Sequence, residues 1–113
     1  MELTEREIIH VNMAIDNILE SGMKLKFQTA YELLKIRREL EDIEEYIAQR
    51  LKMVGLICDK SGMSDENRLS FENEILRSVI NVDINKIPHE ELGSDDNLFV
   101  SLDELEKLRP ILS

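Results

Sequence analysis

Tryptophan is absent from this chain, and cysteine, proline and glycine are scarce, with one Cys, two Pro and four Gly among 113 residues. The single cysteine, Cys58, excludes an intramolecular disulfide and any CxxC zinc or redox motif. Because Pro and Gly are rare and Glu, Lys, Leu and Ile are abundant, the composition favours helix over strand. No apolar run approaches the ~20 residues that a membrane-spanning helix needs. We therefore expect a soluble, intracellular and mainly helical protein.

Basic residues are the minority: 14 Lys and Arg stand against 24 Asp and Glu, which gives a formal net charge of −10. A field of this sign repels nucleic acid and anionic membranes, so we expect neither as a partner. Residues 61–113 hold 12 acids against 5 bases, and residues 1–60 hold 12 against 9. Two interpretations stay open, a solvated surface that keeps the protein soluble and an acidic face that binds a basic partner.

The first helix is predicted over residues 4–21. Thr4 precedes Glu7 by three positions, which is the signature of a capping box. Apolar side chains then recur at spacings of three and four residues and form one stripe, and Gly22 is expected to supply the left-handed residue that ends the helix. The stripe consists of Ile8, Val11, Ile15 and Ile18.

A longer helix is predicted from about Gln28 to Ile57, after a short extended connector that contains "KLKF". Its apolar residues follow heptad spacing, which only Arg50 interrupts, and Leu51 lies next to that gap. The outer face is charged. The apolar stripe of this helix consists of Leu33, Ile36, Leu40, Ile43, Ile47, Val54 and Ile57.

The two predicted helices differ in length. At about 1.5 Å per residue, the second spans roughly 45 Å and the first about 27 Å. An antiparallel pair therefore leaves the stripe from Ile47 to Ile57 without a neighbour in the first helix. The second half of the chain, another subunit, or both must cover it. We expect a protein interface there, made of Ile47, Leu51, Val54 and Ile57.

The rest of the chain predicts a small α+β part. A loop is expected from Cys58 on, a third helix is expected at about 66–78, and residues 79–87 and 97–100 are expected to pair as a two-stranded sheet. Ser101 and Glu104 form a second capping box, and Pro110 ends the last helix. The predicted fold is one domain over 1–113, mainly α, with a coiled-coil-like antiparallel hairpin over 4–57 and a helix–strand–strand–helix region over 66–113.

No arrangement of reactive residues indicates an enzyme. His10 and His89 are the only histidines, and His89 in "PHEEL" lacks the second histidine of the HExxH metalloprotease motif. Phosphate-binding and nucleophile motifs are absent, so we expect no catalytic residue, metal or cofactor. Arg37 and Arg38 have two interpretations: pairing with Glu41 and Asp42 one turn on, or contact with a partner protein.

Several segments in order carry a resemblance to known proteins: "KLKF", "TAYELLKIRRELEDIEEYIAQRLKMV", "SFENEIL", "VINVDINKIP" and "LDELEKL". From Leu25 to Leu108 the chain resembles a group of small proteins encoded by phages and prophages of Gram-positive bacteria. The resemblance implies a viral origin, and a location in the cytoplasm of the bacterial host or in the virion. It implies no known enzymatic activity and brings no functional residues.

Three classes of function follow. The first is a structural or assembly-related phage protein that works through helix–helix contacts. The second is an acidic inhibitor or sequestering protein directed at a host defence or transcription factor. The third is a holdase-like chaperone. In each the partner is a protein, either a second copy of the chain or another protein, and we favour a homo-oligomer.

Overall fold

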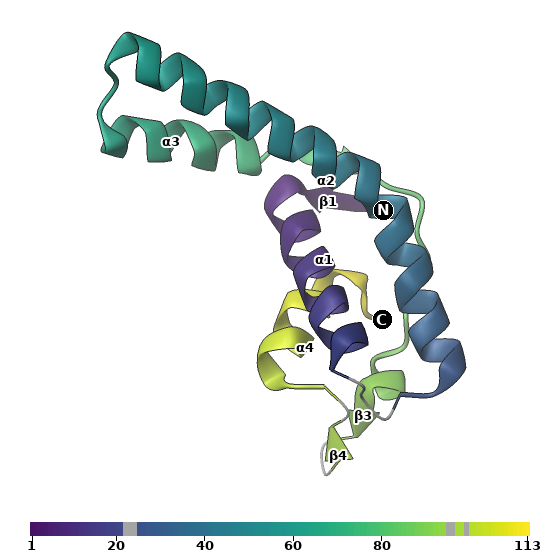
Figure 1. Ribbon diagram of the computed structural model, residues 1–113. Coiled ribbons are helices and arrows are strands. Elements are labelled where there is room, and N and C mark those ends of the chain that lie inside the picture. Colours follow the sequence, from purple (N-terminus) through teal and green to yellow (C-terminus); the bar gives the residue numbers. More distant parts are fainter. Residues whose placement is uncertain (22–24, 95–96, 99) are drawn as a thin grey trace.

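The computed structural model describes residues 1–21, 25–94, 97–98 and 100–113. These residues are mainly helical, with one helix much longer than the others (Figure 1). The elements in chain order are β1 (Glu2–Thr4), α1 (Glu5–Glu20), α2 (Phe27–Ser61), α3 (Asp65–Leu76), β2 (Val79–Asn81), the 3-10 helix η1 (His89–Leu92), β3 (Gly93–Ser94), β4 (Asn97–Leu98), α4 (Leu102–Leu108) and the 3-10 helix η2 (Arg109–Ile111).

Helix α1 begins where the sequence predicts. The Thr4 side-chain oxygen accepts a hydrogen bond of 3.1 Å from the Glu7 backbone, and the Thr4 backbone donates one of 2.9 Å to Glu7 Oε1. These reciprocal bonds satisfy two N–H groups that the first turn of a helix otherwise leaves without partners. The predicted capping box is therefore confirmed. Gly22, which is expected to end the helix, lies outside the described residues.

Helix α1 occupies the centre of the body, between α2 on one side and α4 on the other (Figure 1). All four residues of its predicted stripe are buried, and so is Ala14. Burial of each Val or Ile side chain stabilises the fold by roughly 1.5–3 kcal/mol. Because two helices flank α1, its buried surface is wider than the single stripe that the sequence predicts.

Helix α2 confirms the predicted long helix and continues four residues beyond Ile57. Figure 1 shows that it curves around the body, as long helices do when their outer side faces solvent. Gly62 ends it in the left-handed conformation, with φ of 69°. The part from Cys58 to Ser61, which the sequence assigns to a loop, is helical.

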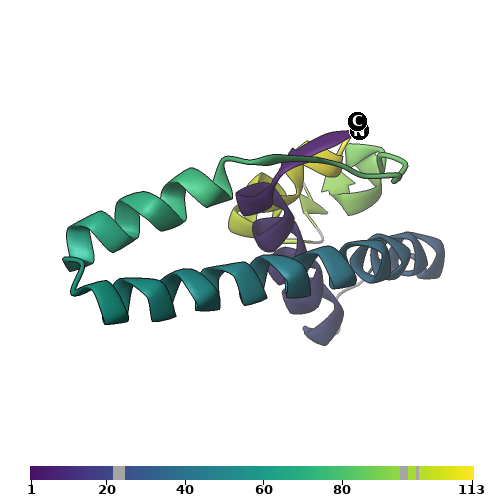
Figure 2. The ribbon, with the colours of Figure 1, turned by 90° about the horizontal axis from the view of Figure 1, so that it is seen from above.

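Helix α3 confirms the third predicted helix and is capped by Ser64, whose side chain accepts a hydrogen bond from the Asn67 backbone. It folds back along the C-terminal part of α2. Figures 1 and 2 show these two segments projecting from the body. We call them the arm, which comprises residues 51–61 of α2 together with α3. None of the twelve residues of α3, all of them described, is buried.

The predicted strand pairing is wrong. Strand β2 pairs with β1 at the N-terminus, with Leu3 opposite Ile80, and β4 pairs with β3. Residues 79–87 therefore do not pair with residues 97–100, of which Phe99 lies outside the described residues. The N-terminal strand escapes prediction because three residues are too few to show a period of two. Its pairing is nevertheless part of the core, since Leu3 is buried.

The C-terminal segment closes the body. The capping box of Ser101 and Glu104 is confirmed, α4 ends at Leu108, and Pro110 lies in η2. The backbone of Ser113 donates a hydrogen bond of 2.9 Å to the Ile87 carbonyl, which fixes the end of the chain beside the segment after β2. Leu108 and Ile111 are fully buried. The mainly helical class with short antiparallel strand pairs is confirmed, whereas the coiled-coil hairpin over 4–57 stays a prediction.

Replacement of Leu3 by Ala tests the unexpected strand. Leu3 is only 2% exposed, so Leu3→Ala should lower the free energy of unfolding by about 2–4 kcal/mol through lost burial and the cavity left behind. Urea unfolding followed by circular dichroism measures the change. Leu102→Ala is the control, because Leu102 is 72% exposed and its truncation should cost no more than about 0.5 kcal/mol. Equal midpoints for the two variants would contradict the role given to β1.

Candidate protein-interaction surface

The four residues predicted to form an interface on α2 lie in different environments. Ile47 is fully buried in the core, Leu51 and Val54 are half-buried, and Ile57 is 61% exposed. Leu51 packs against the core. Beyond Ile47 the buried positions of α2 are Gly55 and Cys58, not Ile57. Ile47 is therefore unavailable to a partner, whereas Ile57 at the C-terminal end of the predicted surface is exposed, and the interface itself stays a prediction.

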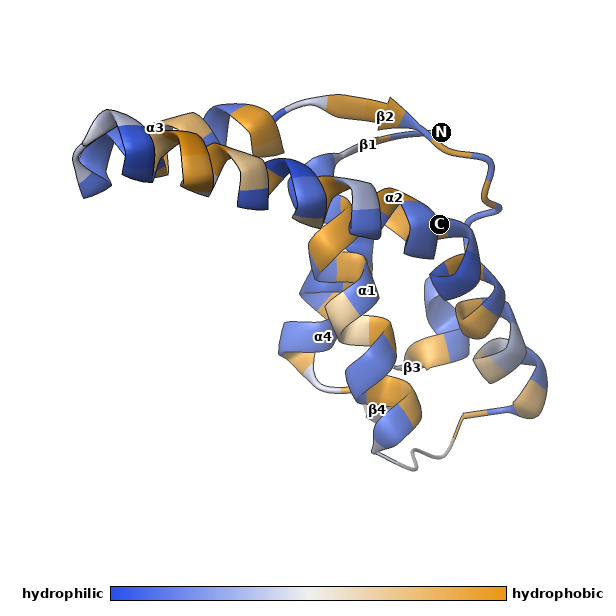
Figure 3. Ribbon diagram, turned by 45° about the horizontal axis from the view of Figure 1, so that its top comes forward, coloured by the Kyte–Doolittle hydropathy of each residue, from blue (hydrophilic) through white to orange (hydrophobic). Residues whose placement is uncertain are grey.

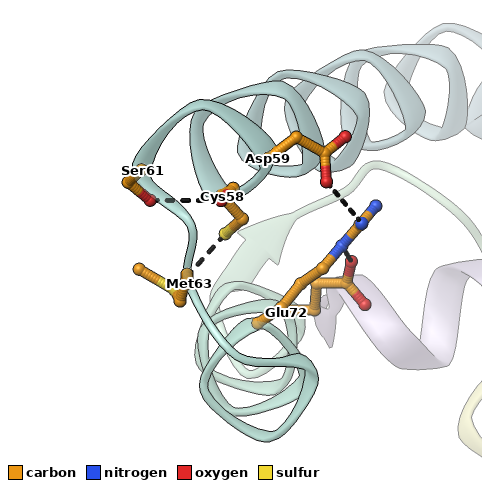
Figure 4. A network of polar contacts seen from close by, with 6 residues as sticks. Cys58, Asp59, Ser61, Met63 and Glu72 are labelled. Carbon is orange, nitrogen blue, oxygen red and sulfur yellow. Dashed lines mark hydrogen bonds and ion pairs between the residues drawn. The ribbon is translucent and has the colours of Figure 1, made fainter.

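Helix α3 covers part of this region of α2. A Cβ atom at Gly55 would lie 2.5 Å from Nη2 of Arg68, so only glycine admits the Arg68 guanidinium this close to α2. That guanidinium lies 3.4 Å from the carboxylate of Asp59 on α2, which ties the two helices together, and 3.3 Å from the carboxylate of Glu72 one turn further along α3 (Figure 4). The second half of the chain thus provides part of the expected cover.

Cys58 lies inside the same contact. It is 3% exposed, and its Sγ lies 3.4 Å from Sδ of Met63 at the turn between the helices (Figure 4). In this environment Cys58 acts as a small apolar side chain that fills space near the end of α2.

Arg37 pairs with neither of the residues expected from the sequence. Its Nε donates a hydrogen bond of 2.9 Å to Asp16 of α1, and its Nη1 lies 3.2 Å from Oε2 of Glu44. The hydrogen bond to Asp16 raises the pKa of the Arg37 guanidinium, burial partly offsets this, and the charge of Glu44 adds to the increase. Arg37 is thus a structural residue between two helices, whereas Arg38 is exposed.

Arg37 belongs to a row of polar contacts between α1 and α2. Glu44 also accepts a hydrogen bond from Nδ2 of Asn12, a fully buried residue, and Arg50 forms an ion pair with Glu5. Along this row the residue numbers increase in α1 while those of their partners in α2 decrease. The two helices therefore run in opposite directions here. We call it the polar ladder, and it consists of Glu5, Asn12, Asp16, Arg37, Glu44 and Arg50.

The Glu5–Arg50 pair is the most buried charge contact of the polar ladder. The Glu5 carboxylate is 1% exposed, and a carboxylate in such a place needs a charged or hydrogen-bonded partner. The backbone N–H of Glu5 also donates a hydrogen bond of 2.9 Å to the Ser78 carbonyl. The carbon atom of the Arg50 guanidinium lies 5.4 Å from the centre of the Tyr46 ring, a distance suited to a cation–π contact.

Sequence reasoning missed the polar ladder, although one signal for it was present. Arg50 is the single interruption of the heptad stripe on α2, and a charge that replaces an apolar residue at a core position requires a partner from another element. Glu5, Asn12 and Asp16 lie seven and four residues apart, and this spacing places them on one face of α1. Together these two patterns indicate a charged seam between the helices.

Exposed apolar side chains gather at both ends of α2. At its start, Phe27, Tyr31 and Leu34 follow one another at helical spacing and are 82%, 48% and 37% exposed. We call these three residues the base patch. The rings of Phe27 and Tyr31 are stacked with centroids 6.2 Å apart, and Nζ of Lys35 lies 5.7 Å from the Tyr31 ring.

The second group lies on the arm, where hydrophobic residues appear on both helices (Figure 3). Each of its side chains is at least half exposed. Soluble domains leave single apolar residues exposed, and several of them on two neighbouring helices make the arm a candidate contact surface. The group consists of Met53, Leu56, Ile57, Leu69 and Phe71.

The polar residues considered for chemistry are dispersed. His10 is half-buried beside a cleft of about 420 Å³ that Glu7 and Lys107 also line. His89 is exposed, with Nδ1 2.9 Å from the Ser113 carbonyl. Across the described residues, no three His, Cys, Asp or Glu side chains are grouped to hold a metal ion. No helix in this part of the chain has the length and apolar composition needed to cross a membrane.

Comparison with known proteins reveals no relative: no family model, no curated protein and no solved structure matches the chain.

Removal of Arg50 tests the polar ladder. Arg50→Ala leaves the buried Glu5 carboxylate without its cation, and since Arg50 is itself about one-third exposed, we expect a loss of about 1–3 kcal/mol. The double variant Glu5→Gln/Arg50→Ala removes the uncompensated charge and should be more stable than Arg50→Ala alone. Urea unfolding of both variants provides the comparison. A double variant less stable than the single one would show that the charge of Glu5 is not what Arg50 compensates.

Proposed function

We propose that this chain is a phage-encoded, non-enzymatic protein with a structural or assembly role, and that it binds another protein through helix–helix contacts. The base patch is the observation that carries the proposal. Phe27, Tyr31 and Leu34 occupy positions i, i+4 and i+7 on the outer side of a long helix. This is the spacing with which an amphipathic helix contacts a second helix or a groove.

The surroundings of the base patch favour a directional contact. Arg38 continues the same spacing one turn after Leu34 and is exposed, and Lys35 lies beside Tyr31. Two cations at one end of an apolar patch favour a partner with acidic residues on the matching side. The rest of this very acidic chain would repel that partner, so the local charge restricts how it can bind.

The finer arrangement of α1 and α2 belongs to the same proposal. We regard residues 4–57 as an antiparallel hairpin stiffened by the polar ladder. The hairpin presents the outer side of α2 without changing shape on binding, which lowers the entropic cost of association. The viral origin rests on the resemblance of the sequence segments to phage and prophage proteins.

Capture of the partner tests the proposal. A tagged wild-type chain is used to capture proteins from lysates of Gram-positive bacteria that carry an induced prophage, and mass spectrometry identifies what is retained. Tyr31→Asp places a charge in the base patch and should reduce binding of a specific partner at least about tenfold. Leu102→Asp is the matched control, an equally drastic change at an exposed leucine of α4, and should bind as wild type. Equal capture by all three forms would argue against the base patch.

The acidic charge favours a second candidate, an inhibitor or sequestering protein that binds a basic surface of a host factor. Residues 61–113 carry 12 acids against 5 bases. On the arm, Glu66 and Glu74 of α3 are exposed and lie near Leu69 along one open cleft. Such a surface would attract a basic partner from a distance and accelerate its association.

Salt dependence separates the two candidates once the partner is captured. The inhibitor class predicts an association rate that falls steeply between about 50 mM and 500 mM NaCl, because the steering field is screened. The base patch, where only Lys35 and Arg38 attract the partner, predicts a much smaller decrease. Stopped-flow fluorescence measures the rate, and Glu66→Gln/Glu74→Gln should reduce the salt dependence only in the inhibitor class. A rate insensitive to salt would exclude electrostatic steering.

A further inference from the structure

We propose that α2 of one copy packs antiparallel against α2 of a second copy, through the solvent side of the helix and centred on residue 40. This inference rests on the proposed function, because the contact includes Leu34 of the base patch and names a second copy of the chain as the protein that binds there. It does not use the arm.

The solvent side of α2 is defined by Leu40. Leu40 is fully buried against the body, so the opposite side of the helix faces away from the body at this point. Successive residues of a helix are turned by about 100°, which places six exposed residues on that side within about 120° of the circumference. We call them the outer face, and they are Leu34, Lys35, Arg38, Asp42, Glu45 and Tyr46.

The charges of the outer face are arranged symmetrically about residue 40, with opposite sign on the two sides. Arg38 and Asp42 lie two residues before and after this centre, and Lys35 and Glu45 lie five residues before and after it. Each base therefore has an acid at the mirror position along the helix. A helix with this pattern is complementary to its own copy when the two run in opposite directions.

An antiparallel contact centred on residue 40 brings the mirror positions together. Arg38 of each copy then approaches Asp42 of the other, and Lys35 of each approaches Glu45 of the other. A two-fold axis perpendicular to the plane of the two helices generates this arrangement, so each contact occurs twice. The acids that the cations beside the base patch require of a partner are thus present on the same helix of a second copy.

Apolar side chains flank the charged centre. Leu34 and Tyr46 lie six residues before and after residue 40 and are 37% and 57% exposed, so the contact places Leu34 of each copy beside Tyr46 of the other. Because α2 curves around the body (Figure 1), the two helices are closest at the centre and separate toward their ends. The body of each copy lies on the inner side of its own α2, so the two bodies project in opposite directions and do not overlap.

The charges disfavour the neighbouring registers. A contact centred on Arg38 would place two arginines together, and one centred on Asp42 would place two aspartates together. A parallel pair of helices would place every charge of the outer face against its own copy. Like charges in contact oppose association, so the pattern selects the antiparallel register centred on residue 40.

The net charge of −10 opposes association of two copies at long range. At about 150 mM salt the screening length is about 8 Å. The charges of the two bodies, on the far sides of the paired helices, are then largely screened, whereas charges in direct contact still interact. The test of the proposal is therefore made at this ionic strength.

Sedimentation of the intact chain tests the proposal at concentrations from about 10 µM to 1 mM, the range suited to a small interface. We expect wild type to shift from monomer to dimer across this range. Arg38→Asp places two acids in contact twice, so its dimer dissociation constant should rise at least about tenfold. Arg109→Asp is the matched control: it changes the net charge equally at an arginine whose side chain is 76% exposed, and it should dimerise as wild type does.

Charge exchange gives the sharper test. Asp42→Arg alone should weaken the dimer as Arg38→Asp does, because two bases then meet. The double variant Arg38→Asp/Asp42→Arg makes both contacts complementary again, so it should dimerise as wild type does. It also keeps opposite charges one turn apart within α2, and circular dichroism of each variant verifies that the helix remains folded.

The outcomes separate this inference from the proposed function. A wild-type chain that is monomeric at every concentration, or a double variant that fails to recover dimerisation, would overturn the contact between copies. Neither result affects capture of a different protein by the base patch, for which Tyr31→Asp is the diagnostic variant. Conversely, dimers that follow the charge exchange while no other protein is captured would support the contact between copies and contradict the binding of another protein.

Discussion

The buried carboxylate of Glu5 is the constraint on which the arrangement of the helices depends. A charge that is only 1% exposed is tolerated where a cation meets it, and Arg50 is the cation that α2 supplies. The Glu5 backbone binds the Ser78 carbonyl at 2.9 Å, and Thr4, the residue before it, ends β1. The first turn of α1, the middle of α2 and the junction of α3 with β2 therefore meet at one residue. Slipping α1 along α2 by one turn would leave Glu5 without its partner.

The arm follows from this register. With Glu5 placed opposite Arg50, α1 has no residue left to cover α2 beyond that point, and eleven residues of α2 continue past Arg50. Helix α3 folds back over them, guided by the left-handed Gly62 and by Gly55, which admits Arg68 against α2. One short helix cannot enclose another, so apolar residues remain exposed on both. The same polar contact that fixes the body therefore also leaves these apolar side chains of the arm exposed.

Local features of the fold were predictable from the sequence, whereas long-range partners were not. Both capping boxes, all three longer helices and the end of α4 shortly before Pro110 depend on residues within one or two turns of each other. The pairing of β1 with β2 joins positions about eighty residues apart through strands of three residues, too short for a pattern. Arg37 could pair with Glu41 or Glu44 on its own helix or with Asp16 on α1. The angle at which the two helices pack determines which of these acids it contacts. For the same reason Ile57 was expected in the interface stripe, while Gly55 and Cys58 are the buried positions.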